Sequence, residues 1–172
     1  NLLQVANAYA ILVNGGKKIT PTILLNNDNE SNGYVNNERV ISEETSKKIR
    51  GLLRLTVKSG TAKKADRIGY EIGGKTGTAE KPTKGGYQKD SIITSFIGVF
   101  PMDRPSYVIA IMLDEPKGIK ETHFYRSAGW TAAPTVGNII ERVGPLLDVM
   151  PTKTKNYWKN FEATYISVKS NE

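Results

Sequence analysis

Ile72-Gly-Gly-Lys75-Thr76-Gly77-Thr78-Ala-Glu80 is the stretch that decides how this chain folds and what it can bind. Lys75 supplies a positive charge with three hydrogen-bond donors, and Thr76 and Thr78 add two hydroxyl groups. Gly77 has no side chain, so another backbone can approach it closely. Together these residues form a compact set for gripping an anion and polarising a group beside it. The apolar first residue, and the apolar segments that follow, predict a strand over 71–80.

The alternation of side chains along a strand divides this set between two faces. Lys75 and Gly77 point to one face, and Thr76 and Thr78 point to the other. Both pairs can serve one ligand only if the strand lies at a sheet edge, where the ligand can pair alongside it. A solvated edge lysine that guards against aggregation is the alternative interpretation of Lys75. We therefore expect strand 71–80 to be an edge strand.

Hydrophobic periodicity predicts an α/β fold, in an α+β arrangement. Apolar residues at helical spacing predict helices over 2–13, 43–57 and 127–143. Two apolar runs, 92–100 and 107–113, flank the turn Pro101-Met-Asp-Arg-Pro105 and predict a hairpin. Its first strand should pair with 71–80. The result is an antiparallel sheet of about three strands with flanking helices.

Polar stretches are expected to connect these elements. The expected connections are an extended segment at 17–25, an exposed loop at 26–37, a polar link at 61–70, a flexible loop at 81–91 and a loop at 114–126. Residues 152–172 form a basic, aromatic tail, in which Thr164–Val168 is a candidate for a short extra strand. The sequence thus predicts one domain over 1–151 followed by this tail.

Composition excludes several classes of protein. The chain has 172 residues, 38% hydrophobic and 24% charged, which is typical of a globular domain rather than a disordered one. Without cysteine, no disulfide and no cysteine-based metal site or nucleophile can exist. No apolar run approaches the ~18 residues of a membrane span. Because the chain opens with Asn1 inside an apolar helical pattern, we expect it to be a piece of a longer protein.

The net charge of +7 raises the question of nucleic-acid binding. The lysines are scattered along the chain, and no recognition helix or RNA-binding aromatic signature lies among them. This pattern favours a solvated basic surface and no nucleic-acid partner. A non-catalytic basic binding module remains an alternative.

A second motif overlaps the first. Gly69-Tyr-Glu-Ile-Gly-Gly74-Lys75-Thr76 fits the P-loop pattern, which would make the chain a nucleotide-binding protein. A P-loop needs a buried strand before it and a helix directly after it. Residues 62–68 are too polar for that strand, and Gly77 and Pro82 oppose that helix. The P-loop is therefore the weaker of the two interpretations.

Other candidate residues carry less chemistry. His123 is the only histidine and makes neither a catalytic triad nor a metal site by itself, so a surface loop is expected for it. Asp114 and Glu115 have no histidine near them and are expected to be loop carboxylates. No metal and no cofactor is implied by the sequence.

The Lys75-Thr-Gly77 element resembles that of the penicillin-binding proteins and serine β-lactamases. Other segments match in the same order: the helix at Asn1–Gly16, Gly60-Thr-Ala62, Gly69-Tyr-Glu-Ile72, Thr94-Ser-Phe-Ile-Gly-Val-Phe-Pro101 and Ala132-Ala-Pro134. The resemblance covers residues 1 to about 151. It is closest to class B enzymes, the cell-division peptidoglycan D,D-transpeptidases of Gram-negative bacteria.

This resemblance implies roles for the motif. Lys75 would lend charge to the proton network of a catalytic serine and attract the substrate carboxylate, to which Thr76 and Thr78 would donate hydrogen bonds. The backbone N–H of Thr78 would be an oxyanion-hole donor. Gly77 would leave room for the ligand backbone.

Two elements of that family are missing from this sequence. No Ser-x-x-Lys, which would supply the nucleophile, and no Ser-x-Asn occurs in it. We therefore expect one wall of an active site that is inactive alone. The resemblance also implies stem peptides, β-lactams and other cell-wall synthesis or cell-division proteins as partners, and a periplasmic location at the inner membrane. Strand 107–113 would keep an unpaired edge, so self-association of the chain is expected.

Overall fold

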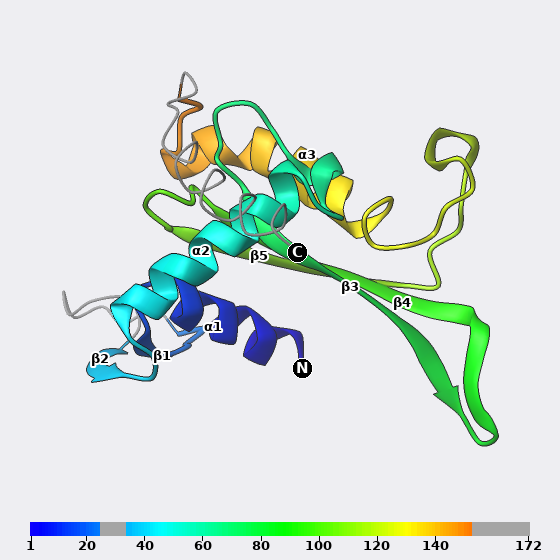
Figure 1. Cartoon of the computed structure of the whole chain (residues 1–172), viewed down its shortest axis with the longest axis horizontal. Coiled ribbons are helices and arrows are strands. Elements are labelled where there is room, and N and C mark those ends of the chain that lie inside the picture. Colours follow the sequence, from blue (N-terminus) through cyan, green and yellow to red (C-terminus); the bar gives the residue numbers. More distant parts are fainter. Residues whose placement is uncertain (25–33, 153–172) are drawn as a thin grey trace, which may run out of the picture.

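A three-stranded antiparallel sheet forms the centre of the protein. The computed structural model describes residues 1–24 and 34–152. The strands are β3 (Gly73–Thr83), β4 (Gly86–Phe100) and β5 (Tyr107–Asp114), in the spatial order β3-β4-β5. Figure 1 shows this sheet running past the helices, with the end of the β3–β4 hairpin projecting away from them. The predicted α+β arrangement and the predicted hairpin are both confirmed.

Three helices flank the sheet: α1 (Leu2–Val13), α2 (Glu43–Lys58) and α3 (Ala132–Val143). Side chains cap the first two of these helices. Oδ1 of Asn1 accepts from the N–H of Gln4 at 3.0 Å, and Oγ of Ser42 accepts from the N–H of Thr45 at 3.1 Å. Short 3₁₀ helices lie at Lys63–Ala65 (η1), Lys120–Thr122 (η2) and Gly144–Leu147 (η3).

The predicted start of the third helix is wrong. The helix was expected from residue 127, but α3 begins at Ala132. The N–H of Ala128 donates to Oγ1 of Thr78 at 3.1 Å, and the carbonyl of Ala128 accepts from the N–H of Ala133 at 2.8 Å. These contacts hold the segment before α3 as a turn against β3. Pro134 lies in the first turn of α3, where a proline is tolerated.

The expected flexible loop at 81–91 is wrong as well. β3 continues to Thr83, β4 resumes at Gly86, and these two residues pair across a two-residue turn. The composition is polar, but ladder hydrogen bonds between backbones need no apolar side chain. Gly86, with φ of 125°, supplies the conformation that closes the turn. We call residues 81–90 the arm.

A second, two-stranded sheet replaces part of another expected loop. β1 (Lys17–Thr20) pairs antiparallel with β2 (Tyr34–Arg39), so residues 34–37 were wrongly assigned to a loop. The Asn-rich composition disfavours a strand, yet backbone pairing and the ion pair between Lys18 and Glu38 join the two strands. The expected extended segment at 17–25 is shorter than predicted, since β1 ends at Thr20. The candidate strand at 164–168 lies outside the described residues.

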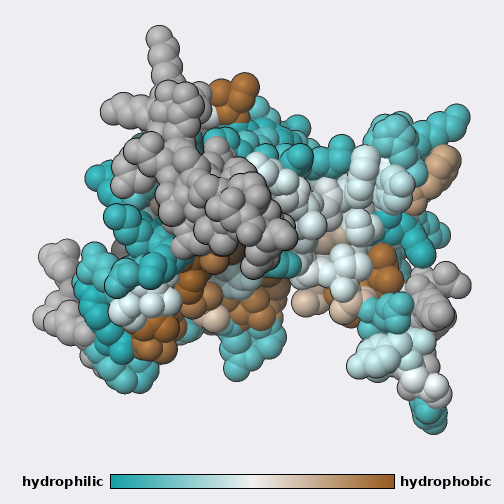
Figure 2. All heavy atoms as spheres, in the orientation of Figure 1, coloured by the Kyte–Doolittle hydropathy of each residue, from teal (hydrophilic) through white to brown (hydrophobic). Residues whose placement is uncertain are grey.

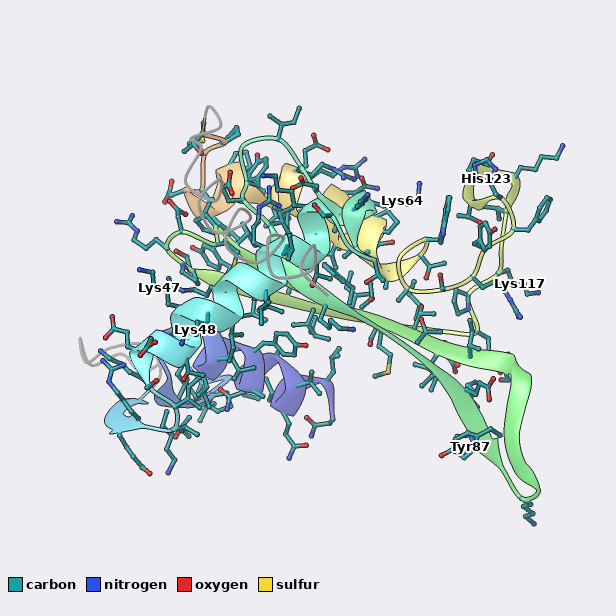
Figure 3. The ribbon with its side chains drawn as sticks, viewed as in Figure 1. Lys47, Lys48, Lys64, Tyr87, Lys117 and His123 are labelled. Carbon is teal, nitrogen blue, oxygen red and sulfur yellow. The ribbon has the colours of Figure 1, made fainter. Side chains whose placement is uncertain are left out.

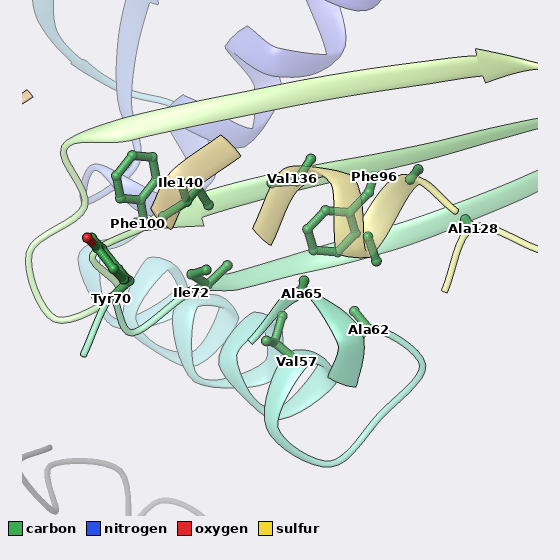
Figure 4. Packing of buried hydrophobic residues seen from close by; sticks show 12 residues of the cluster. Val57, Ala62, Ala65, Tyr70, Ile72, Phe96, Phe100, Ala128, Val136 and Ile140 are labelled. Atoms are coloured by element: carbon green, nitrogen blue, oxygen red, sulfur yellow. The ribbon is translucent and has the colours of Figure 1, made fainter. Parts of the chain in front are cut away.

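The core lies mainly between the sheet and α3 (Figure 4). Phe96 and Phe100 of β4 are fully buried there, together with Val136 and Ile140 of α3. The predicted polar link 61–70 contributes to this core, which corrects that expectation. Its buried residues are Ala62, Ala65 and Tyr70. A smaller cluster on the opposite face joins α1, α2 and the sheet through Val13, Leu53, Val99 and Met102.

Two paired glycines bring α3 close to the sheet. Gly74 of β3 lies opposite Gly98 of β4. A Cβ added to Gly98 would lie 2.8 Å from Cγ1 of Val136, which is closer than such atoms pack. The distance between sheet and helix is therefore set by the absence of a side chain at Gly98.

The described helices are neither long nor apolar enough to cross a membrane. Figure 2 shows the molecule from the same side as Figure 1. Hydrophilic side chains cover much of the coloured surface there, and hydrophobic ones gather over α1. Leu3 and Val5 on α1 are exposed by 55% and 40%. Apolar side chains are exposed in other segments as well, among them Ile68 and Leu146.

Candidate active site

β3 lies at an edge of the described sheet, as predicted. Among residues 1–24 and 34–152 its only ladder partner is β4, with a regular register from Gly73 opposite Val99 to Glu80 opposite Ile92. The same geometry contradicts the P-loop, because Gly73–Thr83 is a continuous strand with no helix after Lys75. The alternative of a nucleotide-binding protein is therefore wrong.

The backbone of β3 shows which residues face the open edge. The carbonyl of Glu71 points toward β4, since it accepts from the N–H of Met102 at 2.9 Å. The carbonyls of Ile72 and Thr76 point away from β4. The first accepts from Nη1 of Arg54 at 2.7 Å, and the second accepts from Nζ of Lys75 at 2.9 Å. Because the direction repeats every second residue, the N–H and C=O of Thr78 also face the open edge.

Thr76 and Thr78 lie on the sheet face that carries α3, opposite Phe96 and Thr94 in the ladder. Oγ1 of Thr76 lies 2.8 Å from Oγ1 of Thr61, which can therefore orient it. Oγ1 of Thr78 accepts from the N–H of Ala128, so its own proton is left to donate elsewhere. The hydroxyl of Thr78 is thus left to donate, and that of Thr76 can donate to a ligand when Thr61 is the donor of their shared hydrogen bond. The sequence analysis did not predict this role of Thr61, because Thr61 and Thr76 are 15 residues apart in the chain.

Lys75 and Gly77 lie on the other face. Lys75 is exposed, and among residues 1–24 and 34–152 no carboxylate pairs with it, so its charge is available to a ligand. A Cβ added to Gly77 would lie 2.6 Å from Oγ of Ser95 on β4. A side chain at position 77 would therefore crowd Ser95 inside the sheet as well as the ligand. Ser95 could not be assigned from the sequence, because the register alone brings it there.

A group of charges, buried except for the partly exposed Asp66, holds the start of β3. We call Arg54, Asp66 and Glu71 the Arg54 cluster. Nη1 of Arg54 lies 2.8 Å from Oδ1 of Asp66, and Nε lies 3.2 Å from Oε2 of Glu71. The same guanidinium donates to the carbonyl of Ile72. The cluster thus ties α2 to the strand just before Lys75.

A second group of charges lies at the other end of β3. We call Lys81, Ser91, Asp114 and Glu115 the Lys81 clamp. Nζ of Lys81 lies 2.5 Å from Oδ1 of Asp114 and 2.8 Å from Oε1 of Glu115, and Ser91 donates a short hydrogen bond to the same Oε1. The hydrogen bond to Asp114, followed by that to Glu115, raises the pKa of Lys81. The hydrogen bonds from Lys81 and then Ser91 lower the pKa of Glu115. Asp114 ends β5 instead of lying in a loop, which corrects that expectation.

His123 lies in the loop after β5, as expected, and is exposed (Figure 3). Its ring meets Trp130 edge to face at 5.5 Å, and Tyr125 stacks on the same indole at 5.1 Å. Nζ of Lys64 lies 4.0 Å from the Trp130 ring centre. These contacts tie the loop to η1 by packing. No group of three or more potential metal-ligating side chains occurs in the described part of the chain.

The penicillin binding protein transpeptidase domain pattern matches residues 1–141 of this chain. Stage V sporulation protein D of Bacillus subtilis is 39% identical over 160 residues, which cover 89% of this chain and 24% of that protein. A probable peptidoglycan D,D-transpeptidase FtsI of Caulobacter vibrioides is 37% identical over 163 residues, 86% of this chain and 26% of that protein. The chain thus spans about a quarter of the length of these relatives.

Solved structures agree with this likeness. The transpeptidase domain of penicillin-binding protein 3 from Burkholderia pseudomallei superposes with a TM-score of 0.75 and 32% identity, covering 89% of this chain and 44% of that one. Penicillin-binding protein 3 from Mycobacterium tuberculosis, complexed with ampicillin, gives a TM-score of 0.71 and 29% identity, covering 90% and 36%.

Proposed function

Since this chain belongs to the penicillin-binding protein transpeptidase family, we propose that it forms one wall of the active site of a peptidoglycan D,D-transpeptidase. The observation that carries the proposal is the open edge of β3. There Lys75 is exposed, and the hydroxyls of Thr76 and Thr78 are both held by neighbours. This edge offers charge, hydroxyl donors and an outward backbone N–H to one extended ligand.

Each group has a role in acyl transfer. Lys75 draws the substrate carboxylate and lends positive charge to the proton network of the serine. Thr76 and Thr78 donate hydrogen bonds to that carboxylate. The N–H of Thr78 stabilises the oxyanion of the tetrahedral intermediate, and one such donor is typically worth ~3 kcal/mol. Gly77 keeps the strand narrow where the ligand backbone lies.

The reaction needs a serine from outside this chain, which has no Ser-x-x-Lys. That serine attacks the carbonyl of the penultimate D-Ala, the bond to the terminal D-Ala nitrogen breaks, and D-Ala leaves with a proton. The amine of a second stem peptide then attacks the ester, forms the cross-link and returns the serine. A β-lactam acylates the same serine, but its ring-opened amide stays attached. Residues 1–151 thus form the C-terminal part of the domain, with 152–172 as a tail.

The proposal also covers partners and location. Peptidoglycan stem peptides and β-lactams are the ligands, and other cell-division or cell-wall synthesis proteins are the partners. The working site is the periplasmic face of the inner membrane, with an anchor supplied by the longer protein. The charge distribution supports no nucleic-acid partner, since basic residues such as Lys18 and Lys48 pair with nearby carboxylates.

Covalent labelling of the full-length protein with a fluorescent penicillin tests the proposal. We expect Lys75→Ala to slow acylation by about 100-fold, the lower range for loss of a group that stabilises developing charge. Lys47→Ala, an exposed lysine on α2, is the matched control and should acylate normally (Figure 3). Normal acylation of folded Lys75→Ala would contradict the assigned role. The 172-residue chain alone should not be labelled, and a covalent adduct on any of its residues would show that the serine is not needed.

A further inference from the structure

The open edge of β3 does not end at Thr78. The register stays regular through Glu80, which pairs with Ile92. Glu80 is two residues beyond Thr78, so its N–H and C=O face the same open edge. Glu80 is exposed, and none of the described residues forms an ion pair with its side chain. The edge therefore carries a second outward pair of backbone groups about 6–7 Å farther along the strand.

Pro82 ends this open edge. It occupies the next position of the same alternation, opposite Tyr87 in the ladder. Proline has no N–H, and it is tolerated on an edge strand where that position faces outward. A peptide can thus exchange hydrogen bonds with Thr78 and Glu80, but it finds no donor at Pro82.

The Lys81 clamp fixes the direction of β3 between these two points. Glu80 pairs with Ile92 while Lys81 pairs with Gln88, so β4 has extra residues at 89–91 and the ladder is irregular there. A bulge of this kind bends a hairpin. Lys81 reaches Asp114 and Glu115 at the end of β5, and the buried Ser91 bonds Glu115. The clamp joins all three strands at the bulge and keeps Glu80 in line with Thr78.

We propose that the edge at Glu80 is a second peptide-binding position, which pairs with the stem peptide on the N-terminal side of its D-Ala-D-Ala end. Lys81 is a positioning residue for this subsite. The inference rests on the proposed function, because the roles of Thr76 and Thr78 set the direction of the peptide. With the carboxylate at Thr76 and the scissile carbonyl at Thr78, the rest of the donor peptide runs toward Glu80.

The pairing makes a specific assignment of hydrogen bonds. The penultimate D-Ala lies opposite Thr78, so the residue two positions earlier lies opposite Glu80. In an antiparallel hydrogen-bonded pair the two residues exchange both bonds. The N–H of that earlier residue donates to the Glu80 carbonyl, and its carbonyl accepts from the Glu80 N–H. Penicillins are too short to reach this position.

A pair of donor peptides tests the first bond on the unmodified full-length enzyme. Ac-Gly-L-Lys-D-Ala-D-Ala offers an N–H at the residue opposite Glu80, whereas Ac-Sar-L-Lys-D-Ala-D-Ala has a methyl group instead. We expect about fivefold lower kcat/KM for the sarcosine peptide, the fold-change of one net hydrogen bond. Release of D-Ala is the measurement. Equal values for the two peptides would overturn the proposal.

A pair of variants tests the second bond. Glu80→Pro removes the outward N–H without breaking the β4 ladder, as Pro82 already shows. It should lower kcat/KM for the glycine peptide about fivefold and leave penicillin acylation unchanged. Glu80→Gln, which removes only the side-chain charge, should turn over both ligands normally. An equal loss on peptide and penicillin in Glu80→Pro, or a loss in Glu80→Gln, would contradict a backbone subsite.

Lys81 is tested by its effect on the two ligands. Lys81→Met should lower turnover of the long peptide about threefold or more while penicillin acylates normally, and Lys81→Arg should restore turnover. A general structural defect would lower both equally and would overturn the positioning role. If penicillin fails to label the unmodified enzyme, the proposed function is wrong. If penicillin labels it while the peptide pair and Glu80→Pro show no effect, only this inference is wrong.

Discussion

The two ends of β3 are both held by charged side chains, but in different surroundings. At the start, the side chains of Arg54 and Glu71 are only 9% and 12% exposed. At the other end, Lys81 is 26% exposed and its partners Asp114 and Glu115 are 68% and 57% exposed. Buried charges lose their hydration on folding and depend on each other, whereas exposed ones keep water as an alternative partner. The first cluster should therefore decide whether the strand folds, and the second should decide where it points.

Arg54→Met gives the largest expected effect. It leaves the carboxylates of Asp66 and Glu71 without their cation and the carbonyl of Ile72 without its donor. We expect the free energy of unfolding to fall by about 3–5 kcal/mol, the cost of breaking a buried ion pair. Urea unfolding followed by circular dichroism measures it, with the exposed Arg104→Met as control. If Arg54→Met lowers the free energy of unfolding no more than Arg104→Met does, the Arg54 cluster does not decide whether the strand folds.

Glu71→Gln should cost less, about 1–2 kcal/mol. Arg54 keeps Asp66 and the carbonyl of Ile72 as partners, and its Nε forms no hydrogen bond with Oε2 of Glu71 that the substitution could remove. The same urea titration measures this value. A loss as large as that of Arg54→Met would mean that Glu71, and not the guanidinium, is the centre of the cluster.

Acid should open the Lys81 clamp when Glu115 becomes protonated. The pKa of Glu115 lies below its ordinary value of 4.5, so its interactions are present above that value and are lost as pH falls through the lowered pKa. The pKa of Lys81 lies above 10.5. The contribution of its ammonium group to stability is therefore present below that value and is lost as pH rises through the raised pKa. An NMR titration of the Glu115 carboxyl should give a midpoint below 4.5. A midpoint at or above 4.5 would show that the clamp is absent in solution.

Lys81→Met should have the smallest effect on stability. The ammonium is accessible to water in both the folded and the unfolded chain, and exposed ion pairs contribute little. The urea midpoint should match that of the unmodified protein within error. A clear loss of stability would place this end of the strand in the same class as the Arg54 cluster.

Much of the sheet could be predicted because its signals are local. The apolar runs at 92–100 and 107–113 and the prolines between them define a hairpin without any distant partner. The arm could not be predicted in this way. Its residues are polar, and it becomes a ribbon because backbone pairing continues outward from a sheet that is already formed. The start of α3 was missed because the contact of Ala128 with Thr78 spans 50 residues.

The residues of the candidate site also fall into two groups: those that a local motif reveals and those that depend on distant contacts. Lys75, Thr76 and Thr78 are adjacent in the chain, so a motif reveals them. Thr61 and Arg54 act on that motif from other segments, and Lys81 acts through Asp114 and Glu115 at the end of another strand. Nothing in their local sequence separates them from ordinary surface threonine, arginine or lysine.

The absence of a side chain at Gly98 connects the packing of α3 to the proposed binding edge of β3. A methyl group at Gly98 would push against Val136, and α3 would have to move. The turn that leads into α3 carries Ala128, whose N–H fixes the hydroxyl of Thr78. A change of a single carbon at Gly98 would therefore be passed through α3 and its leading turn to the hydroxyl of Thr78, which we propose binds the substrate carboxylate. Under the proposed function, a substitution at Gly98 would change β-lactam acylation while every residue of the proposed binding edge stays the same.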